Sequence, residues 1–141
     1  SETELDDMIE VVAGLEAVAG DLACQRMTPA ELAALETLHA RMVETWKRGD
    51  EAAYGALNRE IHEAIMAAAR NPTLTAIYAN VSGRIQRTRY TAHKTPEQWA
   101  RAIEEHEEMM RLLRAKDGVR LAVLMRDHIR GKRPLIRAAY G

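Results

Sequence analysis

Apolar residues recur every three or four positions along most of this chain, with polar and charged residues between them. In residues 4–26 the apolar stripe consists of Leu5, Met8, Val12, Leu15, Ala19 and Leu22. This spacing is typical of amphipathic helices and differs from the two-residue alternation of a half-buried strand. The same spacing returns in five later segments, so the pattern predicts a helical protein.

Turn and cap signals divide the pattern into six predicted helices. TPAE at 28–31 and TPEQ at 95–98 are capping boxes with proline in the first helical turn. Further breaks fall at 49–50, 71–72 and 117–118, and Gly131 and Pro134 weaken the end of the last helix. Because the links are short, successive helices are expected to pack antiparallel. The predicted fold class is all-α, an antiparallel helix bundle.

Four polar residues occupy core-facing positions of these helices: Asn58, His62, His106 and His128. Asn58 and His62 are four residues apart and therefore share one helix face. A single buried histidine is most often bonded to a backbone carbonyl. Three of them on separate apolar stripes favour a metal site in the bundle interior.

Imidazole nitrogen suits several divalent metals, and three histidines leave coordination positions open for water or a ligand oxygen. We expect Zn²⁺, with Ni, Mn, Fe or Co as alternatives. Asn58 can add its carbonyl oxygen, although it is uncharged. His39 and His93 lack this context, so His39 is expected on a helix surface and His93 at a helix end.

An anionic ligand can complete the metal's coordination, and VSGRIQRTRY supplies guanidinium groups to meet it. Arg84 and Arg87 are the predicted effector contacts, and Arg84 lies nearest the apolar stripe. The alternative is that these side chains and Arg89 are solvated, which is the favoured interpretation for Arg87 and Arg89.

Charge and composition exclude several classes. The formal net charge is −1, so no overall basic excess indicates nucleic acid, and the basic stretch RDHIRGKRPLIR is interpreted as a solvated helix end. Cys24 is the single cysteine, which fits the cytoplasm. No segment approaches the roughly 18 apolar residues of a membrane span, and the acidic SETELDD is unlike a signal peptide. Without an initiator methionine, the chain is expected to be a piece of a longer one.

These motifs together resemble the C-terminal effector domain of FadR-type GntR transcription regulators, the FCD domain. The resemblance covers nearly the whole chain, through LEAVAGDLACQRMT, RGDEAAYGALNREIHEAIMAAARNPTL, EEHEEMMRLLRAKD and AVLMRDHI. The family's metal pattern is Asp or Asn, three residues, His, a long gap, His, twenty-one residues and His. Asn58, His62, His106 and His128 follow this pattern.

The resemblance implies an all-α, antiparallel bundle of six to seven helices. It also implies that this bundle is one effector-binding and dimerisation domain spanning 1–141, with a divalent metal and a small organic acid in its interior. It implies a homodimer whose operator DNA is bound by a separate N-terminal winged helix-turn-helix domain, which this chain lacks, and no membrane partner. Effector binding would then control DNA binding through a shift between domain arrangements.

The sequence departs from the family's pattern at two positions. Asn58 stands where aspartate is usual, which removes a negative charge from the metal site. Val12 stands where the family often has an arginine ahead of its Leu-Glu pair, here Leu15 and Glu16. Recognition of a carboxylate is therefore expected to come from elsewhere, such as Arg84.

Two alternatives to a sensor domain are open at this stage. A small helical metalloenzyme would use Glu63, Glu104 or Glu105 as general base, but these glutamates are expected to face solvent, so we predict no catalysis. A dimerisation module with a vestigial pocket is the other alternative, and the changes at Val12 and Asn58 are consistent with it.

Overall fold

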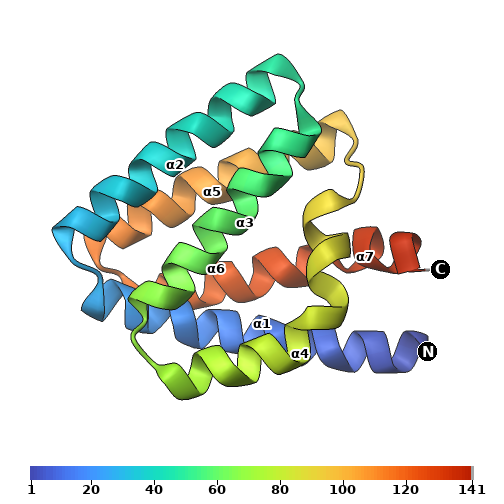
Figure 1. Cartoon of the computed structure of the whole chain (residues 1–141), viewed down its shortest axis with the longest axis horizontal. Coiled ribbons are helices and arrows are strands. Elements are labelled where there is room, and N and C mark those ends of the chain that lie inside the picture. Colours follow the sequence, from blue (N-terminus) through green and yellow to red (C-terminus); the bar gives the residue numbers. More distant parts are fainter. Residues whose placement is uncertain (141) are drawn as a thin grey trace.

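The computed structural model describes residues 1–140, and the side chains of Arg84, Arg87 and Tyr140 lie outside that description. Within this range the chain folds into seven helices without a strand (Figure 1). The helices are α1 (Glu2–Arg26), α2 (Pro29–Arg48), α3 (Glu51–Ala68), α4 (Pro72–Thr91), α5 (Pro96–Ala115), α6 (Gly118–Gly131) and α7 (Arg133–Tyr140). The predicted all-α bundle is confirmed, and the weakened last segment is divided into α6 and α7.

The predicted caps start the helices as expected. Thr28 and Thr95 each accept a hydrogen bond from the third backbone N–H of the helix. In return, the side chains of Glu31 and Gln98 at that third position accept a hydrogen bond from the backbone N–H of the threonine. Each such cap stabilises a helix by about 1 kcal/mol, because it satisfies N–H groups that have no partner inside the helix.

The expectation that successive helices pack antiparallel is only partly correct. α2 packs on α3 and α5 on α6, but α1 does not pack on α2, nor α4 on α5, within the described residues. The most extensive contact joins α1 to α6, which run in opposite directions (Figure 1).

Backbone conformation at the helix ends explains this difference. The residue after α2, Gly49, and the residue after α5, Lys116, have positive φ values of 71° and 57°, which reverse the chain direction. Met27 after α1 and Ala92 after α4 are extended instead, and they lead the chain away from the helix it has left. A left-handed residue closes a helix and turns the chain, whereas an extended one does not.

Two apolar clusters form the core. The first gathers residues of α2, α3, α5, the end of α1 and part of α6. The second gathers residues of α1, α4 and α7, together with Met66 of α3 and Ile129 of α6. The buried face of α1 is rotated from the predicted stripe, since Ile9, Ala13 and Glu16 are buried while Leu15 is only partly so. In α4, Ile77 was predicted to face the core but is 45% exposed.

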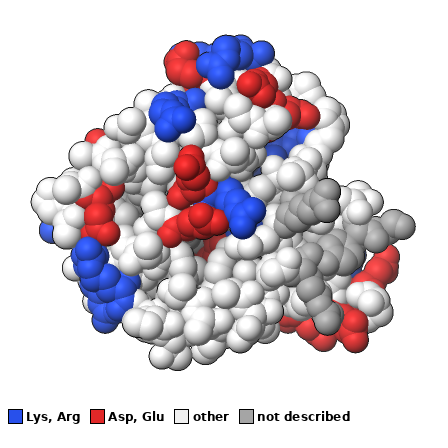
Figure 2. All heavy atoms as spheres, viewed as in Figure 1, with Lys and Arg blue, Asp and Glu red and all other residues white. Residues whose placement is uncertain are grey.

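Charged side chains of both signs are interspersed over the face shown in Figure 2. We expected the basic C-terminal stretch to be a solvated helix end, and this expectation is wrong for several of its side chains. Arg133 and Arg137 pair with Asp6 on α1, and Lys132 is buried. No described helix combines the length and apolarity that a membrane crossing requires.

A close approach of α3 to the end of α4 depends on Gly55. A Cβ atom at this position would lie 2.2 Å from the backbone oxygen of Tyr90, whereas one at Gly14 would have no atom within 4 Å. We expect Gly55→Ala to destabilise the protein by about 1–3 kcal/mol through overpacking. Gly14→Ala, the matched control, is expected to stabilise it by about 0.5–1 kcal/mol. Urea unfolding measures both, and equal effects would contradict this contact.

Candidate metal centre

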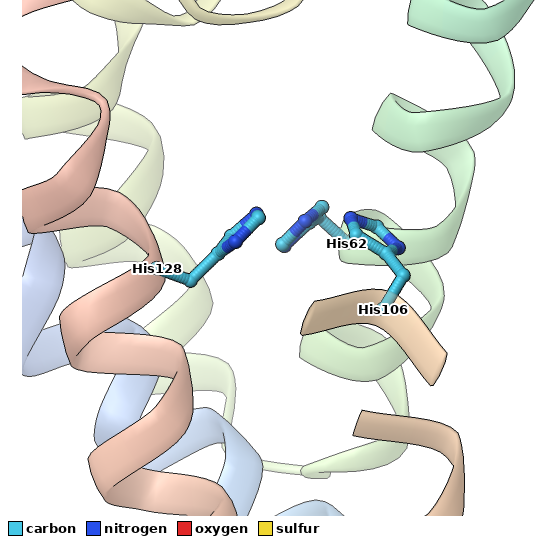
Figure 3. Close-up of side chains that lie close together, drawn as sticks. All are labelled: His62, His106 and His128. Atoms are coloured by element: carbon cyan, nitrogen blue, oxygen red, sulfur yellow. The ribbon is translucent and has the colours of Figure 1, made fainter. Parts of the chain in front are cut away.

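Three histidines from three helices meet in the interior of the bundle. His62 on α3, His106 on α5 and His128 on α6 are at most 4% exposed, and one ligand nitrogen from each lies within 4.8 Å of the others. The ring centroids are 5.2–5.5 Å apart. Figure 3 shows the three imidazoles pointing toward one another. Residues that the sequence predicted as metal ligands are thus brought together.

The Nε2 atoms of all three rings are buried and have no hydrogen-bond partner within the described part of the chain. Burial lowers the pKa of each ring, to about 4 for His62 and well below 6.5 for His106 and His128. Nearby positive charge acts in the same direction, from Arg89 on His62 and from Lys132 on His128. The rings are therefore neutral near pH 7, which is the form that binds a metal.

Asn58 lies one turn before His62 on α3 and is completely buried. Neither its amide nitrogen nor its carbonyl oxygen has a hydrogen-bond partner among the described residues. A buried amide without partners costs about 1–3 kcal/mol, so this position fits a residue that contacts a bound group.

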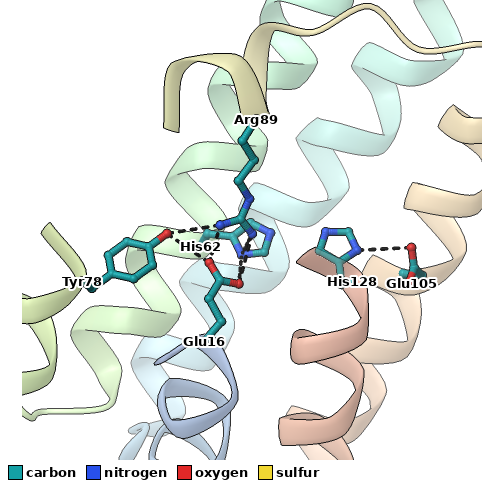
Figure 4. A network of polar contacts seen from close by, with 6 residues as sticks. All are labelled: Glu16, His62, Tyr78, Arg89, Glu105 and His128. Atoms are coloured by element: carbon teal, nitrogen blue, oxygen red, sulfur yellow. Dashed lines mark hydrogen bonds and ion pairs between the residues drawn. The ribbon is translucent and has the colours of Figure 1, made fainter. Parts of the chain in front are cut away.

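Carboxylates hold the outer edges of two of the imidazoles (Figure 4). His128 Nδ1 lies 3.2 Å from Glu105 Oε1. His62 Nδ1 lies 3.5 Å from Glu16 Oε2 and 3.2 Å from Arg89 Nη2, so it has an acceptor and a donor beside it. Such contacts fix the orientation of a ring and occupy Nδ1, which leaves Nε2 of both rings without a partner among the described residues.

Glu16 and Arg89 form a buried ion pair with Tyr78 beside His62. Arg89 Nη2 donates to Glu16 Oε2 at 3.0 Å, its Nη1 also bonds Glu16, and the Tyr78 hydroxyl donates to Glu16 at 3.0 Å. Burial by itself raises the pKa of Glu16, but Arg89 and His62 outweigh it and hold that pKa well below 4.5. Glu16 is thus a carboxylate throughout the neutral range.

Sequence reasoning missed this pair. Arg89 was interpreted as solvated and is in fact 1% exposed, because Glu16 neutralises its charge. The position of Glu16, four residues after Val12 and three before Ala19, was a signal that it faces the core. The predicted effector contacts Arg84 and Arg87 lie on α4, and their side chains are outside the described part of the chain.

The other two histidines differ in exposure. His39, expected on a helix surface, has a side chain only 12% exposed, and its ring is parallel to that of His106 at 6.5 Å. That expectation is therefore wrong. His93 follows the end of α4, is 82% exposed and pairs with Glu51, close to the predicted position.

Two cavities adjoin this region. The larger, of about 760 Å³, lies between α3 and the segment that joins α4 to α5, and its walls include Tyr54, Tyr90 and Trp99. The smaller, of about 350 Å³, lies between α5 and the α6–α7 junction and is lined by His128, Glu105 and Lys132, among others. The smaller cavity therefore reaches one of the three histidines.

Comparisons with known proteins agree with this architecture. A family model described as the FCD domain matches residues 7–131. A solved structure, Streptococcus agalactiae GntR, is similar with a TM-score of 0.77 and 21% identity over 94% of this chain and 59% of that one. E. coli McbR/YncC is similar with a TM-score of 0.83 and 22% identity over 100% of this chain and 68% of that one. No protein of curated function matches the sequence.

Proposed function

Because this chain belongs to the FCD domain family, we propose that it senses an effector for a GntR-type transcription regulator. In this proposal His62, His106 and His128 hold a divalent metal, and a small organic acid binds to that metal. The observation that carries it is the convergence of three buried imidazoles, whose Nε2 atoms have no partner among the described residues.

The residues present fit a metal. In a tetrahedral zinc site with Zn–N bonds of about 2.0–2.1 Å, ligand nitrogens are about 3.3 Å apart. Small ring movements would bring nitrogens that now lie within 4.8 Å to that spacing. Asn58 can add its carbonyl oxygen, and Glu105 can accept a proton from His128 Nδ1. When bound, the metal would act as a Lewis acid and coordinate a carboxylate oxygen of the effector.

The regulatory step would be a shift between domain arrangements. The two similar solved structures are longer than this chain, which spans 59% and 68% of them. We propose that operator DNA is bound by a separate winged domain of a homodimeric regulator. An effector that prefers one arrangement by about 1–3 kcal/mol would change DNA affinity about 5–150-fold.

The positions of the three glutamates considered as general bases make the metalloenzyme alternative less favourable. Glu63 is exposed and bonds Arg59. Glu104 is also exposed. Glu105 was expected to face solvent but is partly buried, and its Oε1 lies 3.2 Å from His128 Nδ1. A general base must reach the reacting atoms. Glu63 and Glu104 are exposed on the surface, and Glu105 contacts the side of His128 that carries Nδ1.

Metal content tests the proposal. Protein purified without a polyhistidine tag is expected to contain about one metal ion per chain by elemental mass spectrometry. The His106→Ala/His128→Ala variant is expected to contain none, whereas His93→Ala, outside the cluster, keeps the wild-type content. Adding metal at 100 times its Kd should stabilise the wild type by about 2.7 kcal/mol. No bound metal, with no thermal shift on adding Zn, Ni or Mn, would refute the metal site.

A further inference from the structure

Lys132 carries a buried amine without a partner. It caps the end of α6, is 7% exposed, and its Nζ has no hydrogen-bond or ion-pair partner in the described structure. The ring of Tyr90 lies beneath it at 5.9 Å. An uncompensated buried charge is strongly destabilising, so such a lysine fits a site whose counter-charge arrives with a ligand.

Lys132 and His128 line the same cavity of about 350 Å³. This volume falls within the range of small-molecule sites. Lys94, which is also buried, and Arg101, which is exposed at the edge, add positive charge to its wall. Of the two carboxylates on the wall, Glu105 is engaged by His128. The wall of the cavity therefore carries more basic than acidic side chains, and it includes one of the three histidines.

Arg89, a buried basic group beside His62, is already bonded to other side chains of the protein. Arg89 donates to Glu16 and Tyr78, and its Nη2 lies 3.2 Å from His62 Nδ1, so only its Nε is without a partner among the described residues. Val12, at the position where an arginine would reach the interior from α1, is completely buried. Burial, together with Arg89 and Lys94, lowers the pKa of Lys132 well below 10.5. An anion bound beside it would restore the charged form.

We propose that Lys132 binds one carboxylate of the effector, and that the effector is a small dicarboxylic acid reaching from Lys132 toward the three histidines. This inference rests on the proposed metal site. Two separate positive centres, the lysine and a divalent metal, would line one cavity and match the two charges of a dicarboxylate. The Lys132 bond would be a charge-assisted hydrogen bond, roughly twice as strong as one between neutral groups.

Calorimetric titration of metal-loaded protein with succinate and with butyrate tests the inference, because these four-carbon acids differ by one carboxylate. Wild type is expected to bind succinate at least tenfold more tightly than butyrate. Lys132→Met should lower succinate affinity at least tenfold and remove the preference, while Lys132→Arg retains part of it. Lys47→Met, at an exposed lysine on α2, is the matched control and should behave as wild type.

Metal content of the same samples separates the two proposals. If metal is bound but succinate affinity is unchanged in Lys132→Met, the lysine site is refuted while the metal site stands. The lysine site is also refuted if metal-loaded wild type binds neither acid, or binds both equally. Loss of the metal from wild type would refute the proposed function itself.

Thermal stability gives an independent readout that needs no ligand. Without effector, Lys132→Met is expected to raise the Tm, because it removes a buried amine that has no hydrogen-bond partner in the described structure. A lower Tm in the variant would mean that Lys132 has a structural role in the ligand-free protein, and would overturn the assignment.

Discussion

Replacing Arg89 by methionine is expected to lower the free energy of unfolding by about 3–5 kcal/mol. The substitution leaves the Glu16 carboxylate buried without its arginine, and only the Tyr78 hydroxyl and His62 remain beside it. Desolvating a charge costs several kcal/mol, and only a well-placed opposite charge offsets this cost. Urea unfolding at pH 7.5 measures the effect.

Two controls distinguish the effect of breaking the buried Glu16–Arg89 pair from the effect of removing any arginine. Arg59→Met removes an arginine whose partner Glu63 is also exposed, and should cost only about 0.2–1 kcal/mol. The double variant Glu16→Met/Arg89→Met is expected to be more stable than Arg89→Met alone, because no charge is left without a partner. If Arg89→Met costs no more than Arg59→Met, the buried pair contributes nothing measurable.

Metal-free protein is expected to lose stability as the pH falls below 6.5. The pKa of His62 is about 4 in the folded state against 6.5 ordinarily, because burial and then Arg89 disfavour its protonated form. Between these values the unfolded chain binds a proton that the folded chain does not, so stability falls with pH. For His62 alone this amounts to about 2 kcal/mol between pH 6.5 and 5. The pKa values of His106 and His128 are lowered in the same direction.

Urea unfolding in the presence of a chelator, at pH 7.5, 6.5, 5.5 and 5, checks this dependence. His106→Gln should reduce the pH slope, because one buried ring that resists protonation is gone. His93→Gln, at an 82% exposed side chain, should leave the slope unchanged. A stability that stays constant from pH 7.5 to 5 would show that the three rings take up protons without unfolding, contrary to their burial.

Short sequence motifs predicted the features of the fold that depend on interactions between residues near one another in the chain. The TPAE and TPEQ boxes start α2 and α5 as expected, since a cap satisfies N–H groups only three residues away. The three histidines were identified because helical periodicity places them on apolar stripes, and the structure brings them within 4.8 Å. Their binding of a metal, with or without Asn58, stays a prediction.

The sequence alone determined the helices, their caps and the set of imidazoles that faces the interior, because each depends on spacing along a single helix. Tertiary structure alone decided which charges are buried. Glu16 and Arg89 are 73 residues apart, and Arg89 can leave water only because the carboxylate meets it there. Lys132 is buried beside the ring of Tyr90, and its Nζ has no such partner in the described chain. The free energy of burying a charged side chain depends on the groups that surround it in space. The periodicity of residues along the chain carries no information about those groups.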